Sequence, residues 1–287
     1  MSLGRMAAVF LGAAALSISG GCLGKRGGGS ATSPSGIGGG TPSAFTVDDG
    51  VRFSGVHPAP LVLNGVTYVY QNTGTDGTML EASADGLAFA LTAASFPAGV
   101  SRTIVSLSDG RFRMYYFADG TSVDIRSAVS TNGLNWTVED GTRYSEPDIG
   151  AVRATVLPIG GYRLYYVTSA GISSAMSSDG LTFVAEGPVT LPLPDGSSMW
   201  GASAAAYLNG RFHMVLTKVP SSGASELWHA VSTDGRNWTV DKGALAVNPG
   251  VPLNQPAWSI NGNTTRIYFR AQPPGGGNAI GSGIVRF

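Results

Sequence analysis

The sequence predicts an all-β protein, a five-bladed β-propeller of four-stranded blades, and three observations support this prediction. Close copies of one hairpin motif recur about every fifty residues, and a period of that size is typical of propellers or stacked repeats. A second, aromatic-rich motif lies upstream of each hairpin. The first and last folded segments match different strands of one repeat, which indicates a closed ring.

The composition suits short strands joined by many turns. Of 287 residues, 42 are glycine and only 13% are charged, a balance that favours strands and tight turns over long helices. The formal net charge is zero, so we expect no basic surface for phosphates and no nucleic-acid partner. Cys22 is the single cysteine, which rules out an intramolecular disulfide.

The first residues predict an export signal, residues 1–21. Arg5 precedes an apolar run, Met6 to Ile18, that is too short to span a membrane. The segment Ser19-Gly20-Gly21-Cys22 resembles the lipobox of bacterial lipoproteins, which implies lipidation of Cys22; ordinary signal cleavage is the alternative. We therefore expect a protein of the bacterial cell envelope that contacts the membrane through a lipid anchor alone.

Residues 22–44 are rich in glycine, serine, threonine and proline. Such a segment cannot form a core, so we expect a flexible tether. Because the repeats run without a break from Phe45 to Phe287, residues 45–287 are predicted to form one propeller domain.

The hairpin motif joins an apolar strand to a strand opened by an aromatic residue. Its copies are EASADGLAFAL (Glu81–Leu91), SAVSTNGLNWTVEDG (Ser127–Gly141), SSAMSSDGLTFVAEG (Ser173–Gly187) and HAVSTDGRNWTVDKG (His229–Gly243). Asn, Asp and Gly tolerate positive φ, so we expect two-residue type I′ turns with positive φ at both central positions. We expect the serines to be turn residues rather than nucleophiles, and the aromatics to pack between strands or blades. These residues are Ser83, Ser130, Ser177 and Ser232, and Phe89, Trp136, Phe183 and Trp238.

The second motif has five copies against four hairpins. They are GVTYVYQN (Gly65–Asn72), GRFRMYYFA (Gly110–Ala118), GYRLYYVTS (Gly161–Ser169), GRFHMVLTK (Gly210–Lys218) and NTTRIYFRA (Asn263–Ala271). The segment GSGIVRF (Gly281–Phe287) matches the strand before each hairpin turn, and FTVDDG (Phe45–Gly50) matches the strand after it. We therefore expect the N-terminal strand to complete the last blade, which closes the ring and leaves few free sheet edges.

The S-x-D-G-x-x-W/F hairpins and G-x-Y/F-R-x-Y-Y strands together resemble the five-bladed propeller glycoside hydrolases. This is the superfamily of arabinanases, levansucrases and invertases, and family 43 is the nearest. The Asp-box of six-bladed sialidases is a competing match, but it usually reads S-x-D-x-G-x-x-W, with one more residue between Asp and the aromatic. These motifs build blades and carry no chemistry, so a function has to be argued from site residues.

The innermost strand of each blade lines the channel of a propeller, so ligand groups are expected where these strands begin. Counting back from the second motif places the starts near His57, Arg102, Val152–Arg153, Ala202 and Gln255, and Trp200 lies beside the fourth. The family 43 resemblance implies an Asp-Pro at the first start, in which the Asp is the catalytic base. His57-Pro58 stands there instead, so the base carboxylate is absent.

Glycoside hydrolysis normally needs two carboxyl groups roughly 5 to 10 Å apart. The remaining catalytic candidates are Glu146 and Asp148 before the third blade and Asp195 before the fourth. The alternative for each is a solvated loop acid or a turn former.

The strand starts also offer a binding site. Arg102 and Arg153 could hold the carboxylate of an acidic glycan in charge-assisted hydrogen bonds, and Trp200 could stack on a sugar ring. The alternative is that the two arginines pair with the candidate acids and seal the channel. No cluster of metal ligands is visible, so we expect no metal and no cofactor.

Three functions fit these residues. The absence of the base carboxylate favours an envelope propeller that binds carbohydrate and has lost its catalytic acids. The second is an active glycoside hydrolase with a rearranged acid pair, drawn from Glu146, Asp148 and Asp195, with His57 as a proton carrier. The third is a scaffold that binds another protein. The sequence leaves open whether the protein is an enzyme.

Overall fold

The computed structural model describes residues 42, 44–72, 78–118, 124–192, 199–202, 205–218, 225–247, 253–273 and 275–287, of which 199–202 and 247 are described by their backbone alone. The chain divides into two compact units, Met1–Thr32 and Ser33–Phe287, and every described residue belongs to the second. The predicted signal, Cys22 and most of the predicted tether lie outside the described residues. Within the described ranges no helix has the length and apolar character needed to span a membrane.

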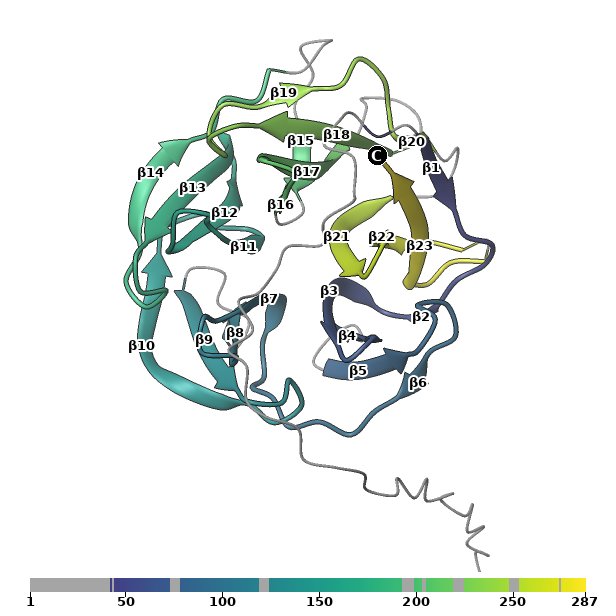
Figure 1. Cartoon of the computed structure of the whole chain (residues 1–287), viewed down its shortest axis with the longest axis horizontal. Helices are drawn as coiled ribbons and strands as arrows, with labels where there is room; N and C mark the ends of the chain where they lie inside the picture. Colours follow the sequence, from purple (N-terminus) through teal and green to yellow (C-terminus); the bar gives the residue numbers. More distant parts are fainter. Residues whose placement is uncertain are drawn as a thin grey trace, which may run out of the picture. The chain divides into compact units, whose positions relative to one another are not determined.

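The described strands form five antiparallel sheets arranged as the blades of a propeller, as predicted (Figure 1). Blade 1 contains β3 (Val56–Leu63), β4 (Val66–Asn72), β5 (Thr78–Ser83) and β6 (Ala90–Leu91). Blade 2 contains β7 (Val100–Ser106), β8 (Phe112–Phe117), β9 (Asp124–Ser130) and β10 (Thr137–Ser145). Blade 3 contains β11 (Val152–Val156), β12 (Tyr162–Thr168), β13 (Gly171–Ser177) and β14 (Val184–Pro188).

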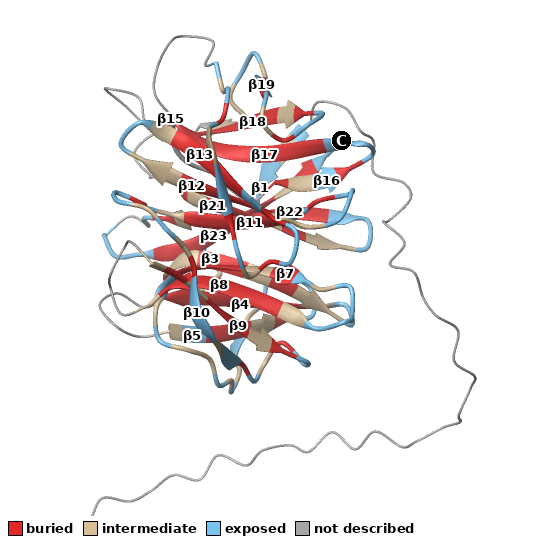
Figure 2. Cartoon of the chain, turned by 90° about the vertical axis from the view of Figure 1, so that its left-hand side faces the viewer, coloured by how far each residue is buried: buried red, intermediate tan, exposed pale blue. Residues whose placement is uncertain are grey.

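Blade 4 has interrupted inner and outer strands. It contains β15 (Met199–Ala202), β16 (Ala206–Leu208), β17 (Arg211–Lys218), β18 (Glu226–Ser232), β19 (Thr239–Val240) and β20 (Ala246–Val247). Blade 5 contains β21 (Asn254–Asn261), β22 (Thr264–Ala271) and β23 (Ala279–Arg286), with β1 (Ala44–Val47) and β2 (Phe53–Ser54) on its outer edge. Buried residues follow the strands, whereas the connecting loops are largely exposed (Figure 2).

The N-terminal strand closes the ring as predicted. β1 pairs with β23 in antiparallel register, with Phe45 opposite Val285. Asp48, which follows β1, accepts a hydrogen bond from the Ser282 hydroxyl at 2.6 Å and forms an ion pair with Arg266 of β22. Backbone and side-chain contacts therefore both join the two ends of the domain.

The hairpin turns differ from the predicted type I′. Glycine alone takes positive φ, as in Gly86 at 74°, while the preceding Asp or Asn does not. In the first hairpin the Asp85 carboxylate accepts the backbone N–H groups of Leu87 and Ala88, at 2.8 and 2.9 Å, and the Ser83 hydroxyl accepts that of Gly86. The loop is therefore longer than a two-residue turn. The Asp and Ser side chains stabilise it because they accept the backbone N–H groups that a tight turn would pair with carbonyls of the opposite strand. The serines are turn residues, as predicted.

Tyrosine hydroxyls join neighbouring blades. A tyrosine on the second strand of one blade donates to the carbonyl of the turn glycine in the next blade. The pairs are Tyr70 with Gly133, Tyr115 with Gly180, Tyr165 with Gly235 and Tyr268 with Gly86. The motif aromatics pack edge-on against the same tyrosines, as in Phe183 on Tyr115 with ring centroids 5.6 Å apart. Blade 4 has Val215 at the tyrosine position, because blade 5 takes its outer strand from the other end of the domain and has no such turn.

Three buried arginines on the second strands of their blades pair with carboxylates. Arg113 donates from Nε and Nη2 to both carboxylate oxygens of Glu139, at 2.8 and 2.9 Å, and from Nη1 to the carbonyl of Asp179 in the next blade. The equivalent pairs are Arg163 with Glu186 and Arg266 with Asp48. In blade 4 His213 takes the arginine position and contacts His229, which in turn contacts Asp241. The charges of the three second-strand arginines are therefore neutralised locally.

Candidate functional site

Four of the five inner strands have a register shift near their start, and three of them place a residue with positive φ there. The register of β3, β7 and β21 shifts within the first residues of each strand. His57, Ser101 and Gln255 take positive φ there, at 54°, 53° and 55°. Such a conformation costs about 1–3 kcal/mol for a non-glycine residue and is often found at functional sites. Bulges also re-aim side chains, so the predicted strand starts have a special geometry.

His57 and Gln255 join blades 1 and 5 where the inner strands begin, at the end of the channel that we call its mouth. The Gln255 side-chain oxygen accepts the backbone N–H of His57 at 2.9 Å, so its amide nitrogen is the donor to His57 Nε2 at 3.1 Å. The imidazole proton then lies on Nδ1, which is buried without a partner. Burial, followed by the charges of Arg153, Arg270 and Arg102, lowers the pKa of His57 to about 4. The imidazole is therefore neutral at pH 7 and offers an N–H donor.

Arg102 is 2% exposed, and the acceptors of its hydrogen bonds among the described residues are neutral. Its guanidinium donates to the side-chain oxygen of Asn72 at 3.2 Å and to the carbonyl of Pro97 at 2.9 Å, and it lies 5.6 Å from the centre of the Phe96 ring. Burial lowers its pKa to about 10, so the group keeps its charge at pH 7.

Arg153, on the next inner strand, has a similar environment. It is 4% exposed and donates to the carbonyl of Val152 at 2.8 Å and to the hydroxyl of Ser101 at 3.4 Å. Burial lowers its pKa to about 10. Neither it nor Arg102 forms an ion pair with a carboxylate of the described residues, so the predicted alternative of pairing with Glu146 or Asp148 is not what the structure shows.

A small cavity lies between these inner strands. Its volume is about 50 Å³, and residues of β3, β7, β11 and β21 line it, among them Arg102, Arg153 and Trp258. Sequence reasoning missed Trp258, which lies three residues beyond Gln255 on β21. Side chains alternate between the two faces of a strand, and this alternation was the available signal for Trp258. The bulge at the start of β21 changes the alternation, so counting from Gln255 does not give the side chains that face the channel.

The candidate acids lie in the loop between β10 and β11. Glu146 accepts hydrogen bonds from the hydroxyls of Tyr144 and Tyr166, the latter at 2.6 Å. Asp148 is exposed, and hydrogen bonding from Ser169 lowers the pKa of its carboxyl. Neither residue lines the small cavity. The third candidate, Asp195, and the side chain of Trp200 lie outside the described residues, and no three His, Cys, Asp or Glu side chains gather as metal ligands in the part that is described.

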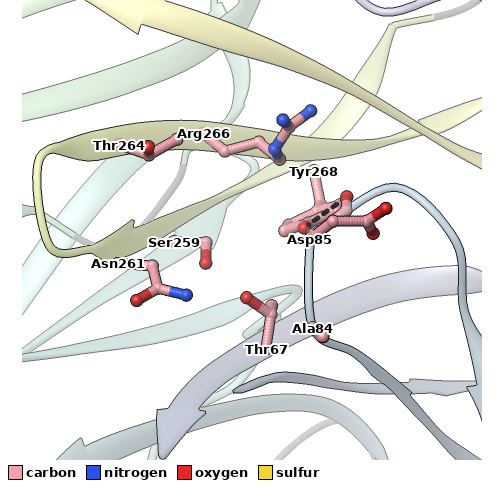
Figure 3. A pocket seen from close by; sticks show the side chains of 9 residues that line it. Thr67, Ala84, Asp85, Ser259, Asn261, Thr264, Arg266 and Tyr268 are labelled. Carbon is pink, nitrogen blue, oxygen red and sulfur yellow. Dashed lines mark hydrogen bonds between the residues drawn. The ribbon is translucent and has the colours of Figure 1, made fainter. Parts of the chain in front are cut away.

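A second pocket, of about 240 Å³, lies between blades 5 and 1 on the side of the hairpin turns (Figure 3). Arg266, Tyr268, Asp85, Thr67 and Asn261 are among the residues that line it. At the equivalent junctions Arg113 and Arg163 donate to a turn carbonyl of the next blade, whereas Arg266 is bonded to Asp48 and Ser282. Among the described contacts, this junction therefore lacks the bond from arginine to the turn carbonyl that Arg113 and Arg163 form at theirs.

The sequence matches no family model and no curated protein. The structure is similar to an N-acetylgalactosamine deacetylase from F. plautii in complex with blood group B trisaccharide, with 15% identity, a TM-score of 0.67, and coverage of 85% of this chain and 96% of that one. A Bacillus subtilis arabinanase gives 14% identity, a TM-score of 0.60, and coverage of 84% and 97%. A GH43 protein from Bacillus licheniformis gives 9% identity, a TM-score of 0.64, and coverage of 84% of this chain and 56% of that one. The fold is thus that of a glycoside-hydrolase-like propeller, as the blade motifs implied.

Proposed function

We propose that this propeller binds a carbohydrate at the mouth of its channel and does not hydrolyse it. The observation that carries the proposal is the set of N–H donors at the strand starts. His57 stands where the family resemblance implies the base carboxylate, and Arg102 and Arg153 stand at the next two starts. Sugars present many hydroxyl acceptors to such donors. Similar structures include proteins named for glycans, namely the deacetylase bound to a trisaccharide and the arabinanase.

The positions of the two described candidate acids, Glu146 and Asp148, support binding without hydrolysis. Two carboxyl groups would have to lie about 5 to 10 Å apart across the scissile bond. Glu146 is bonded to two tyrosines and Asp148 to a loop backbone, and neither lines the channel cavity. His57, with a pKa of about 4, is protonated in about one molecule in a thousand at pH 7 and is a poor proton carrier there.

The proposal includes the location predicted from the sequence. A signal ending before Cys22 and lipidation of that cysteine would hold the propeller at the bacterial envelope on the tether of residues 22–44. A Cys22→Ala variant should then move from the membrane fraction to the soluble fraction of cells. Membrane association that survives this change would contradict a lipid anchor.

The test is a panel of plant and microbial oligosaccharides, with the melting shift and the released sugar measured in the same samples. We expect at least one sugar to raise the melting temperature without being cleaved. The shift should be lost in Gln255→Ala, which frees His57, and kept in Arg111→Gln, an exposed arginine paired with Asp109. Released sugar would identify a glycosidase and direct attention to Glu146. No shift and no release would favour the protein scaffold.

A further inference from the structure

We propose that the small channel cavity is an anion site, and that it receives the carboxylate of a uronic acid unit at the end of the bound glycan. The anion site stands on the geometry of the cavity alone. Its assignment to a sugar acid rests on the proposed function above.

Three of the residues that line the cavity, Arg102 in blade 2, Arg153 in blade 3 and Trp258 in blade 5, each carry a buried hydrogen-bond donor without a partner. These are Nε of each arginine and Nε1 of the indole. The hydroxyl of Thr103, also in the lining, accepts the N–H of Ala154 at 3.0 Å. Buried donors normally have partners. Arg52, Arg143 and Arg236 also have an unpartnered Nε, but around this cavity such donors come from three blades, which favours a ligand that accepts hydrogen bonds.

The charge of this site is not balanced by described residues. Arg113 and Arg163, at 6% exposure, each hold a glutamate through two hydrogen bonds of 2.7–3.0 Å. Arg102 and Arg153 are buried at least as deeply, yet their bonds go to an amide, a hydroxyl and backbone carbonyls. A buried guanidinium without a counter-charge is unfavourable. The same fold thus neutralises its blade arginines and leaves its channel arginines for an anion.

The size and lining of the cavity favour a carboxylate. At about 50 Å³ it is far smaller than the roughly 300–1,000 Å³ of pockets that enclose a whole ligand, so we expect it to receive one small group of the sugar. A carboxylate is planar and presents two acceptor oxygens, which suits the N–H groups of guanidinium. The walls contributed by Pro58, Pro60 and Ala257 lower the local dielectric and strengthen such bonds. The sugar ring would remain at the mouth, where His57 and Gln255 lie.

The first experiment needs no variant. Calorimetry and melting shifts on the full-length protein compare galacturonate with its neutral methyl ester, and acetate with chloride at equal ionic strength. We expect galacturonate and acetate to bind and to raise the melting temperature, and the methyl ester to bind at least about 10-fold more weakly, as the loss of charged hydrogen bonds requires. Equal affinities for the acid and the ester would overturn the proposal.

The second experiment uses Arg102→Gln and Arg153→Gln. Each should weaken galacturonate binding about 10- to 100-fold, while Arg111→Gln, an exposed arginine paired with Asp109, serves as the control and should retain binding. An Asp195→Asn variant that gains anion affinity would show that Asp195 is an internal counter-charge, and would overturn the proposal of an external ligand.

These outcomes separate the two proposals. Binding of acetate and galacturonate without binding of any oligosaccharide would retain the anion site and reject the glycan function. Binding of neutral oligosaccharides without any preference for carboxylates would retain the glycan function and reject the anion site.

Discussion

The hydroxyl groups that join the blades should contribute unequally to stability. Gly235 O accepts from Tyr165 at 2.8 Å and also from the Trp238 indole at 3.1 Å, so Tyr165→Phe leaves the carbonyl one donor. Gly180 O has Tyr115 as its side-chain donor, and its turn is followed by a phenylalanine that cannot donate. Tyr115→Phe therefore leaves a buried carbonyl unsatisfied.

The Tyr70 junction should be the most sensitive. The hydroxyl of Tyr70 donates to Gly133 O and accepts from the Trp136 indole at 2.8 Å, so Tyr70→Phe leaves two buried groups without partners. A hydrogen bond contributes about 1 kcal/mol net, and an unsatisfied buried group costs about 1–3 kcal/mol. We therefore expect losses of about 1, 2 and 3 kcal/mol for Tyr165→Phe, Tyr115→Phe and Tyr70→Phe.

Urea and thermal unfolding followed by circular dichroism would measure this series. At about 2–4 °C per kcal/mol for a domain of this size, the melting temperatures should be separated by several degrees. Tyr207→Phe, a change at an exposed tyrosine, is the control and should leave stability unchanged. Equal losses in the three variants, or the largest loss for Tyr165→Phe, would refute the assignment of stability to hydrogen-bond partners.

Three further changes test the blade interiors and the ring closure. Burial lowers the pKa of His213 to about 4, below the 6.5 expected in the unfolded chain, so the stability it contributes is complete above pH 6.5 and is lost as the pH falls towards 4. In urea melts between these pH values, His213→Gln should lose about 3 kcal/mol less stability than the unchanged protein, which retains the separate contribution of His57. Deleting residues 44–50 removes β1 and should lower the melting temperature of the whole domain; unchanged melting would contradict closure by this strand. Glu139→Gln leaves Arg113 without its charge partner and should cost about 2–3 kcal/mol in chemical unfolding, whereas Asp109→Asn, in an exposed pair, should have no measurable effect.

The architecture was predictable because each blade repeats its own motif. The aromatic-rich strands and the hairpins marked the second to fourth strands, and the match between Phe45–Gly50 and the outer strands predicted the ring closure that β1 forms with β23. The predicted turn type was wrong because the Asp85 carboxylate accepts the loop N–H groups in place of backbone carbonyls. The preference of a residue for positive φ gives no information about such side-chain hydrogen bonds. Conformational propensity is a property of a single residue, whereas the conformation of this loop depends on hydrogen bonds among several residues.

The site was predictable only in part. Counting along the repeats placed His57, Arg102 and Arg153 at the inner strand starts, where the structure has them. Whether an arginine is paired depends on strands that are distant in sequence. Arg113 and Arg102 look alike in the sequence, yet one holds Glu139 and the other has only neutral acceptors.

The ring can close only after the last blade has been synthesised. Asp48 and Ser282, which meet beside β1, are 234 residues apart. At about 5–20 residues per second, a ribosome would make the second roughly ten to fifty seconds after the first. The contacts within each of the first four blades are local by comparison, and they can form in order as the chain emerges. β1 therefore has no partner strand until β23 has been synthesised, and a stalled or shortened chain would leave β1 unpaired.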